Sequence, residues 1–218
     1  MYLADDQIKS TGFRFLVYLM IAFFLLASCS KKKEAPLPSG SQVLALGDSL
    51  TAGNGVTSRE AWPSLLASRT GWHVVNGGVS GDTSEEALQR LPALLEEHQP
   101  VLVLVTLGGN DMLRHIPQNE TIANLEKILA LIKAQGARPV LLAVPKPSVA
   151  GAAFRSLTAA DFYQDVARSQ HTPLIKDAVA EVLSDPQMKG DPLHPNAAGH
   201  ALLSVMIYDA IKSIGYIR

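Results

Sequence analysis

A serine that follows a short apolar run is the first residue of this sequence whose setting suits nucleophilic chemistry. Ser49 comes after residues 43–46, Val-Leu-Ala-Leu, which have the composition of a strand and no helical period. A glycine-rich turn follows at residues 51–55. A serine that ends a buried strand is held on rigid backbone, with its hydroxyl facing whatever lies beyond the sheet edge. Gly-Asp-Ser-Leu alone is also typical of an ordinary turn, so the other groups that acyl transfer needs must come from elsewhere in the chain.

His194 is the histidine best framed to act as a base. A serine hydroxyl is a poor nucleophile until a base accepts its proton, and that base must be held in one tautomer. Asp191 lies three residues before His194, and Pro192 and Pro195 frame the pair. A turn of this length can bring the carboxylate to Nδ1 and leave Nε2 free for Ser49, and the prolines reduce the backbone entropy lost. The pattern therefore predicts His194 as base and Asp191 as its orienter.

The chain also contains rival groups for both roles. His200 lies six residues beyond His194, inside the predicted final helix, where we expect it to cap a polar face. Ser80 and Ser84 are rival nucleophiles, but the glycines around Ser80 favour a backbone turn that binds anions. The other histidines lack a framing aspartate or proline and are interpreted as surface or loop residues: His73, His98, His115 and His171.

Acyl transfer also needs hydrogen-bond donors aimed at the developing oxyanion. The backbone N–H of Ser49 is one candidate. Gly81 is a second, because a residue without a Cβ lets a substrate approach its amide closely. Asn110 is a third, through its side-chain NH₂, with glycines at 108 and 109 giving room. These three donors would complete the set of groups for a serine hydrolase.

Two aspartates beside these glycines, Asp48 and Asp111, are also candidates for acids or metal ligands. Aspartate next to turn glycines characteristically accepts hydrogen bonds from nearby backbone, so we expect both to brace their loops. The single cysteine, Cys29, excludes an internal disulfide and a cysteine-based metal site. No cluster with metal-ligand spacing is visible in the sequence, and we predict neither a metal nor a cofactor.

Apolar runs and amphipathic stretches alternate from residue 42 onward, and together they predict an α/β fold. Strands are expected at 43–46, 73–76, 101–107, 139–144 and 173–175, and helices at 61–68, 83–98, 122–132, 159–169, 177–183 and 195–214. Thr83 and Glu86 match a capping box, and Leu202 and Leu203 are expected in the buried stripe of the last helix. Such alternation implies a parallel sheet covered on both faces, with ligands bound beyond the carboxyl ends of the strands.

Four glycine- and aspartate-containing segments follow one another in a fixed order along the chain. They are Gly-Asp-Ser-Leu at 47–50, Ser-Gly-Asp at 80–82, Gly-Asn-Asp at 109–111 and Asp-Pro-Leu-His at 191–194. They resemble the four blocks of the GDSL (SGNH) hydrolases, and especially the small bacterial multifunctional acyl-thioesterase, arylesterase and lysophospholipase group. The resemblance covers residues 42–216, which is the whole predicted folded domain.

This resemblance implies a role for each of the residues singled out above. Ser49 would be the nucleophile, His194 the base and Asp191 its orienter, while the Ser49 N–H, Gly81 and Asn110 would form the oxyanion hole. It also implies a flavodoxin-like, three-layer α/β/α sandwich with a five-stranded parallel sheet.

The N-terminal region predicts export and a lipid anchor. Residues 15–27 form an uninterrupted apolar run after Lys9 and Arg14, too short to span a bilayer comfortably and typical of a signal-peptide core. The small residues before Cys29 resemble the lipobox of bacterial lipoproteins, in which the peptide is cut before a cysteine that then carries lipid. An ordinary signal peptide cut nearby, or a signal anchor, stays as the alternative.

The predicted organisation is therefore a signal peptide at 1–28, a lipidated cysteine and flexible tether at 29–41, and an SGNH hydrolase domain at 42–218. The protein would sit in the cell envelope, lipid-anchored, at the outer membrane or periplasmic face if the cell has two membranes. A chain of 218 residues suits one domain, and its formal net charge of −1 shows no footprint for nucleic acid.

The predicted activity is hydrolysis of acyl esters or thioesters through an acyl-enzyme at Ser49, with a small acyl ester or thioester as the binding partner. One alternative is an O-acetylesterase acting on cell-envelope carbohydrate. A nucleotide- or sugar-binding module is supported only by Gly77-Gly78 after a strand, without a P-loop lysine. A non-catalytic lipid-binding lipoprotein is the last alternative. Apolar residues in the loops after the strands favour an acyl chain over a sugar: Leu113, Ile116, Val149 and Phe154.

Overall fold

The centre of the fold is a sheet of five parallel strands. The computed structural model describes residues 35–148 and 156–218. The strands are β1 (Gln42–Gly47), β2 (His73–Gly78), β3 (Leu102–Thr106), β4 (Arg138–Leu142) and β5 (Leu174–Ile175), in the order β2-β1-β3-β4-β5. All four pairings between neighbours are parallel. The predicted five-stranded parallel sheet is confirmed.

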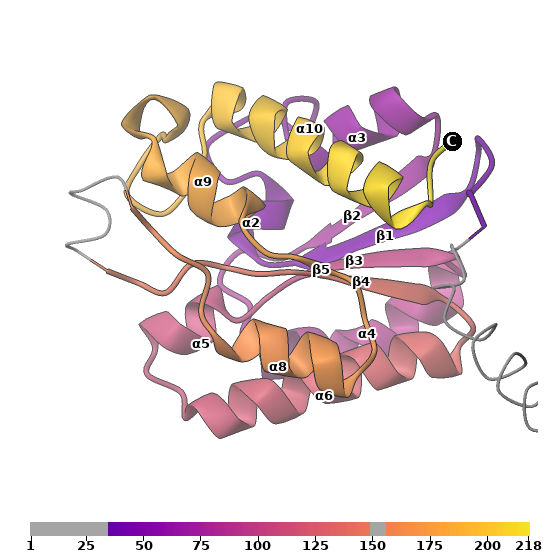
Figure 1. Ribbon diagram of the computed structural model, residues 1–218, viewed down its shortest axis with the longest axis horizontal. Helices are drawn as coiled ribbons and strands as arrows, with labels where there is room; N and C mark the ends of the chain where they lie inside the picture. Colours follow the sequence, from indigo (N-terminus) through magenta and orange to yellow (C-terminus); the bar gives the residue numbers. More distant parts are fainter. Residues whose placement is uncertain (1–34, 149–155) are drawn as a thin grey trace, which may run out of the picture. The chain divides into compact units, whose positions relative to one another are not determined.

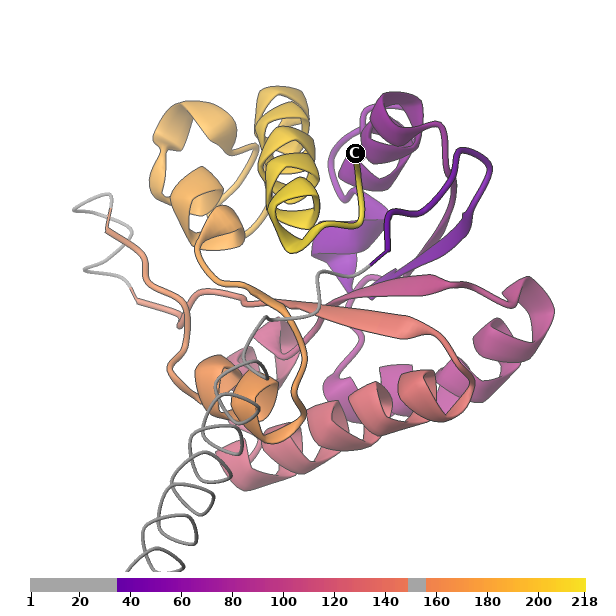
Figure 2. The same cartoon turned by 45° about the vertical axis from the view of Figure 1, so that its right-hand side comes forward.

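Helices cover both faces of this sheet, so the domain has three layers (Figure 1). One face carries α3 (Trp62–Thr70), α9 (Ala178–Ser184) and α10 (Ala197–Ile214). The other face carries α4 (Ser84–His98), α6 (Gln118–Ala134) and α8 (Phe162–Ser169), and the turned view separates the two layers clearly (Figure 2). Short elements complete the chain: α2 (Ser49–Ala52), α5 (Gly109–Leu113) and the 3₁₀ turn η1 (Pro186–Met188). The predicted α/β/α sandwich is confirmed.

Two inner strands of the sheet, β1 and β3, are buried on both faces. Residues 43–46 of β1 and 102–105 of β3 are fully buried, because helices pack on both faces of the sheet. Strands buried on both faces read as continuous apolar runs, and this property made them visible in the sequence. β1 is paired on both sides, so its carboxyl end lies between those of β2 and β3.

The start of α4 confirms the predicted capping box. Thr83 Oγ1 accepts the backbone N–H of Glu86 at 3.3 Å, and Glu86 Oε2 accepts that of Thr83 at 2.8 Å. Two backbone donors that the first turn of a helix leaves without a partner are thereby satisfied. This fixes the entry point of α4, just after the glycine turn at residue 81.

Two predictions about α10 are wrong. Leu202 is 38% exposed, whereas His200 and Ser204 are fully buried together with Leu203 and Ile207. Residues 200, 203, 204 and 207 follow the helical repeat and share one face, while residue 202 lies off it. His200 therefore faces the protein interior and does not cap a polar face.

The buried position of His200 changes its chemistry. Its Nδ1 accepts the backbone N–H of Trp62 at 3.4 Å, and its Nε2 has no partner among the residues that the structure describes. Burial lowers the pKa of His200 to about 4, with a smaller contribution in the same direction from His194. His200 is a neutral part of the packing between α10 and α3, so it is not a rival base.

Several predictions concern residues outside the described ranges. These are the signal peptide at 1–28, the lipidated Cys29, the tether as far as residue 34, and Val149 and Phe154 of one loop. The described end of the tether is bonded to the domain: Leu37 donates its N–H to the carbonyl of Tyr216 at 2.8 Å. Within residues 35–148 and 156–218, no helix has the length and apolarity needed to cross a membrane.

Candidate active site

Ser49 is the first residue of α2, a single helical turn that begins where β1 ends. Asp48 caps this turn, because its Oδ1 accepts the backbone N–H of Leu50 at 3.0 Å. Gly53 ends the turn in the left-handed conformation, with a φ of 89°. The expectation that Asp48 braces its loop is confirmed.

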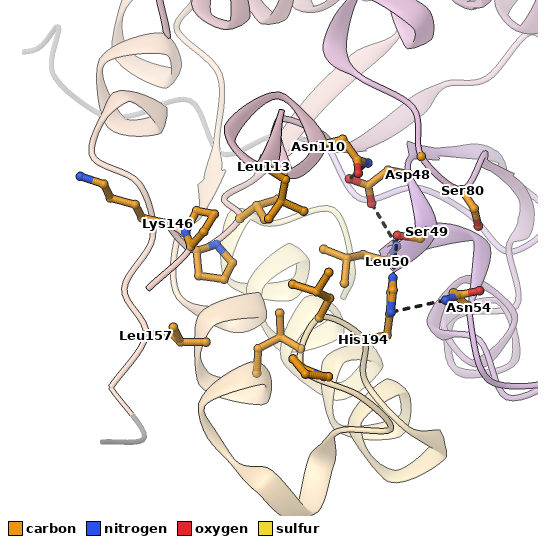
Figure 3. Close-up of a pocket in the computed structure, with 18 of the residues that line it drawn as sticks. Asp48, Ser49, Leu50, Asn54, Ser80, Asn110, Leu113, Lys146, Leu157 and His194 are labelled. Carbon is orange, nitrogen blue, oxygen red and sulfur yellow. Dashed lines mark hydrogen bonds between the residues drawn. The ribbon is translucent and has the colours of Figure 1, made fainter. Parts of the chain in front are cut away.

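His194 and Asp191 lie directly beside Ser49. His194 Nε2 is 2.9 Å from Ser49 Oγ, and His194 Nδ1 is 2.7 Å from Asp191 Oδ2 (Figure 3 labels Ser49 and His194). Asp191 Oδ1 also accepts the backbone N–H groups of Leu193 at 2.7 Å and of His194 at 2.9 Å. The structure thus brings the three side chains into one hydrogen-bonded chain, as their spacing predicted.

The electrostatics of Asp191 suit an ionised partner for the imidazole. Partial burial raises the pKa of Asp191, but hydrogen bonds from the His194 ring and the Leu193 N–H outweigh this effect. The pKa of Asp191 therefore lies below its usual value. An ionised carboxylate beside Nδ1 fixes the tautomer in which Nε2 can accept a proton from Ser49.

Asn54 is a neighbour of His194 that sequence reasoning did not identify. Its Nδ2 lies 3.3 Å from His194 Nδ1, and Figure 3 shows its side chain next to the His194 ring. Nothing in the sequence around residue 54 distinguishes this asparagine from an ordinary turn residue.

The three predicted oxyanion donors meet at the same place. Gly81 occupies the turn closed by the N–H of Asp82 on the carbonyl of Val79 at 3.1 Å, and its φ of 91° suits glycine. Within the described part of the chain, the backbone N–H groups of Ser49 and Gly81 donate to no acceptor. Asn110 Nδ2 donates to the Asp82 carbonyl at 2.9 Å, and only a long contact of 3.4 Å joins it to Asp48 Oδ2.

The rival nucleophiles have different surroundings. Ser84 is fully buried and donates to Asp111 Oδ1 at 2.5 Å, while Asp111 Oδ2 accepts the Ser84 N–H at 2.9 Å. Asp111 therefore braces the start of α4, as expected. Ser80 lines the same pocket as Ser49, but the nearby His194 ring bonds to Ser49 and not to Ser80.

These groups open into a pocket of about 560 Å³. Figure 3 shows Leu50 next to Ser49 and His194, and Leu113 and Leu157 farther from them along the pocket. The remaining apolar lining comes from Val144, Pro145, Pro147, Leu183, Pro192 and Leu193. A mostly apolar cavity of this size with a few convergent polar groups is typical of a small-molecule site. Across the described ranges, no group of three or more His, Cys, Asp or Glu side chains could hold a metal.

Comparison with known proteins identifies the family. The family model described as "GDSL-like Lipase/Acylhydrolase family" matches residues 45–202. The chain belongs to this family. It is 42% identical over 159 residues to "Thioesterase 1/protease 1/lysophospholipase L1" of Escherichia coli K12, covering 71% of this chain and 75% of that protein. It is 37% identical over 182 residues to an arylesterase of Vibrio mimicus, covering 81% and 87%.

A solved structure agrees with this assignment. The crystal structure of TesA superposes with a TM-score of 0.71 at 33% sequence identity, covering 79% of this chain and 98% of that one. The predicted family resemblance, the fold of the SGNH hydrolases and the class of enzyme, a serine hydrolase acting on ester bonds, are confirmed. The site around Ser49 therefore lies on the fold that this family of hydrolases shares.

Asp48 provides a test of the electrostatics around Ser49. Burial raises its pKa to about 6, although the hydrogen bond from Leu50 acts in the opposite direction. The folded protein therefore binds this proton more tightly than the unfolded chain does, and ionising Asp48 as pH rises from about 4 to about 6 costs up to about 3 kcal/mol of stability. We predict that Asp48→Asn removes this loss. Urea unfolding of both proteins at pH 4 and pH 7.5 measures it.

The difference in free energy of unfolding, variant minus wild type, should be larger at pH 7.5 than at pH 4. Asp209→Asn, which changes an exposed carboxylate on α10 with no ion pair among the described residues, is the matched control and should leave the difference in free energy equal at the two pH values. An equal difference at both pH values for Asp48→Asn would contradict the assigned burial cost.

Proposed function

We propose that this protein hydrolyses carboxylic esters or thioesters of acyl chains through an acyl-enzyme formed on Ser49. The observation that carries the proposal is the hydrogen-bonded chain from Ser49 Oγ to His194 Nε2 at 2.9 Å and from His194 Nδ1 to Asp191 Oδ2 at 2.7 Å. Ser49 and His194 line a mostly apolar pocket. The names of the relatives, thioesterase, lysophospholipase and arylesterase, support the same chemistry.

The first step is attack of Ser49 Oγ on the acyl carbonyl carbon. His194 Nε2 takes the hydroxyl proton as the new C–O bond forms. Asp191 keeps the ring oriented and stabilises the imidazolium that results, since its carboxylate accepts the Nδ1–H. The side chain of His194 is only 16% exposed, so the ring is held in place by its surroundings.

The carbonyl oxygen becomes negatively charged in this step and needs donors. The free N–H groups of Ser49 and Gly81 and the amide of Asn110 line the same pocket and would receive it. One proton of Asn110 Nδ2 is held by the Asp82 carbonyl, which leaves the other to exchange its long contact with Asp48 for the oxyanion. Removing one such donor typically lowers turnover by about 10²–10³-fold.

Collapse of the intermediate releases the leaving group. The imidazolium of His194 gives its proton to the departing alcohol or thiol, and the acyl group stays on Ser49 Oγ. A water molecule then attacks the acyl-enzyme with His194 again acting as base, and the carboxylic acid leaves with Ser49 restored.

The apolar wall supports an acyl chain over a sugar as the group that is bound. Leu50, Leu113 and Leu157 line the pocket (Figure 3), and apolar side chains form most of its wall, with Ser80, Lys146 and Ser148 as polar side chains outside the hydrogen-bonded groups around Ser49. An O-acetylesterase acting on envelope carbohydrate would need a more polar wall, because sugar hydroxyls that leave water must find new hydrogen-bond partners in the protein.

We also propose the location that the N-terminal sequence predicts. Residues 1–28 would act as a signal peptide, and Cys29 would carry the lipid that holds the domain of residues 42–218 at the cell envelope. The apolar run at 15–27 and the small residues before Cys29 support this proposal. Two or more acyl chains suffice for stable anchoring.

Labelling with a fluorophosphonate probe tests the nucleophile. Ser49→Ala should abolish labelling and lower kcat for a p-nitrophenyl ester by at least about 10³-fold, since triad members contribute effects of that size. Ser80→Ala, which changes the other serine of the pocket, is the matched control and should label normally. Retained activity in Ser49→Ala would overturn the proposed function.

A chain-length series tests the substrate class. We predict that kcat/KM for p-nitrophenyl esters rises from acetate to medium chains, because each CH₂ buried in the apolar pocket contributes about 0.8 kcal/mol. Thioesters and lysophospholipids with the same acyl chains complete the series. A strict preference for acetate would favour the carbohydrate O-acetylesterase instead.

A further inference from the structure

We propose that Arg90 is the positioning residue of the oxyanion hole, holding all three donors in register through a single guanidinium group. Arg90 lies on α4 and belongs to none of the four family blocks. Its Nε donates to Asp82 Oδ2 at 2.6 Å, its Nη1 to the Gly77 carbonyl at 2.8 Å and its Nη2 to the Gly47 carbonyl at 3.0 Å. The inference rests on the proposed function and adds the residue that organises the site.

The contact with Gly47 controls the nucleophile turn. The Gly47 carbonyl ends β1 and precedes Asp48 and Ser49, and it also accepts the N–H of Val79 at 3.1 Å. Fixing this carbonyl fixes the peptide plane between Gly47 and Asp48. The Ser49 N–H, the first of the three donors, belongs to the next peptide, so its direction follows from this plane and from the backbone of Asp48, with a φ of −102° and a ψ of −147°.

The contact with Asp82 controls the other two donors. Asp82 directly follows Gly81, and its N–H closes the turn on the Val79 carbonyl. Its own carbonyl accepts Asn110 Nδ2 at 2.9 Å. One residue held by Arg90 therefore sets both the turn that presents the Gly81 N–H and the rotation of the Asn110 amide.

The geometry requires a guanidinium group. Arginine presents its donors in a planar fork, whereas a lysine ammonium is a compact point charge that cannot reach three acceptors spread over β1, β2 and the turn. The side chains of Arg90 and Asp82 are 24% and 11% exposed. Without the guanidinium, the nearly buried Asp82 carboxylate would have no cation beside it. An unpaired buried charge is destabilising, so the turn at residues 79–82 would shift to expose this carboxylate to water.

Arg114 offers a second cation near the turn but a different role. Its Nη2 donates to the Gly81 carbonyl at 2.6 Å, and its side chain is 51% exposed. Within the described residues, its hydrogen bond reaches the Gly81 segment alone, whereas Arg90 bonds to the segments of Ser49 and Gly81 and reaches Asn110 through the Asp82 carbonyl. Arg90 therefore couples the donors, and Arg114 adds local support.

Kinetics of Arg90→Lys and Arg90→Gln in the full chain test the proposal. A misplacement of about 1 Å in a reacting group costs about 100-fold in rate, so we expect kcat for p-nitrophenyl butyrate to fall about 10–100-fold. KM should stay within about threefold, because the lost interactions belong to the transition state. Arg69→Gln is the matched control, since Arg69 bonds to Ser204 between α3 and α10 at 3.1 Å, away from the site.

A double-mutant cycle with Asn110→Ala separates positioning from simple structural support. If Arg90 acts through Asn110, Arg90→Lys should cost less in the Asn110→Ala background than in the wild type, giving a non-additive pair. Added guanidinium ion at non-denaturing concentrations should partly restore kcat of Arg90→Gln but not of Ser49→Ala. If an arginine variant fails to fold, Asp82→Asn tests the same link.

The outcomes distinguish this inference from the proposed function. Full kcat in Arg90→Lys or Asp82→Asn, with activity still dependent on Ser49, would overturn the role of Arg90 alone. The role of Arg90 would also be overturned if its variants lost kcat additively with Asn110→Ala, in proportion to a lowered unfolding midpoint, and if added guanidinium ion restored none of the lost kcat. Activity that survives Ser49→Ala would overturn the proposed function itself.

Discussion

The close approach of α2 to the end of β1 is the constraint on which the site depends. Gly47 lies between Gly78 and Thr106 in the sheet, and a Cβ on Gly47 would come within 2.1 Å of Thr51 Oγ1. A Cβ on Gly78 would come within 2.2 Å of the backbone nitrogen of Ala52. Only glycine at both positions lets the turn that carries Ser49 rest directly on the sheet. The nucleophile is therefore held by covalent geometry and sheet pairing, not by a mobile loop.

Ionisable side chains also hold the backbone segments around Ser49 in place. The strands end at one edge, and each ends in backbone groups that need partners there. Asp48 and Asp111 satisfy N–H groups of α2 and α4, and Arg90 satisfies two strand-end carbonyls. These side chains are largely buried, so each of these hydrogen bonds also fixes the direction of the backbone segment that it joins. The donors near Ser49 thus belong to a connected network and not to independent loops.

The sequence predicted the fold and the Ser49–His194–Asp191 contact well, because each depends on local signals. Buried strands read as apolar runs, and the spacing of Asp191 and His194 within one turn limits what the two can contact. Arg90 and Asn54 were missed, since their partners come from segments far away in the chain and neither residue has a distinctive neighbourhood. His200 was misjudged because a polar residue type concealed a position that the helical repeat places in the core.

The position of the oxyanion decides whether Ser49, Gly81 and Asn110 form the oxyanion hole, and a crystal structure of the enzyme phosphonylated by a p-nitrophenyl phosphonate tests this directly. The phosphonyl group of the adduct places one oxygen where the tetrahedral intermediate of the reaction has its oxyanion. We predict a covalent bond from phosphorus to Ser49 Oγ, with that oxygen about 2.7–3.1 Å from the backbone nitrogens of Ser49 and Gly81 and from Asn110 Nδ2. An adduct on another residue, or a phosphonyl oxygen turned away from these three nitrogens, would contradict this prediction.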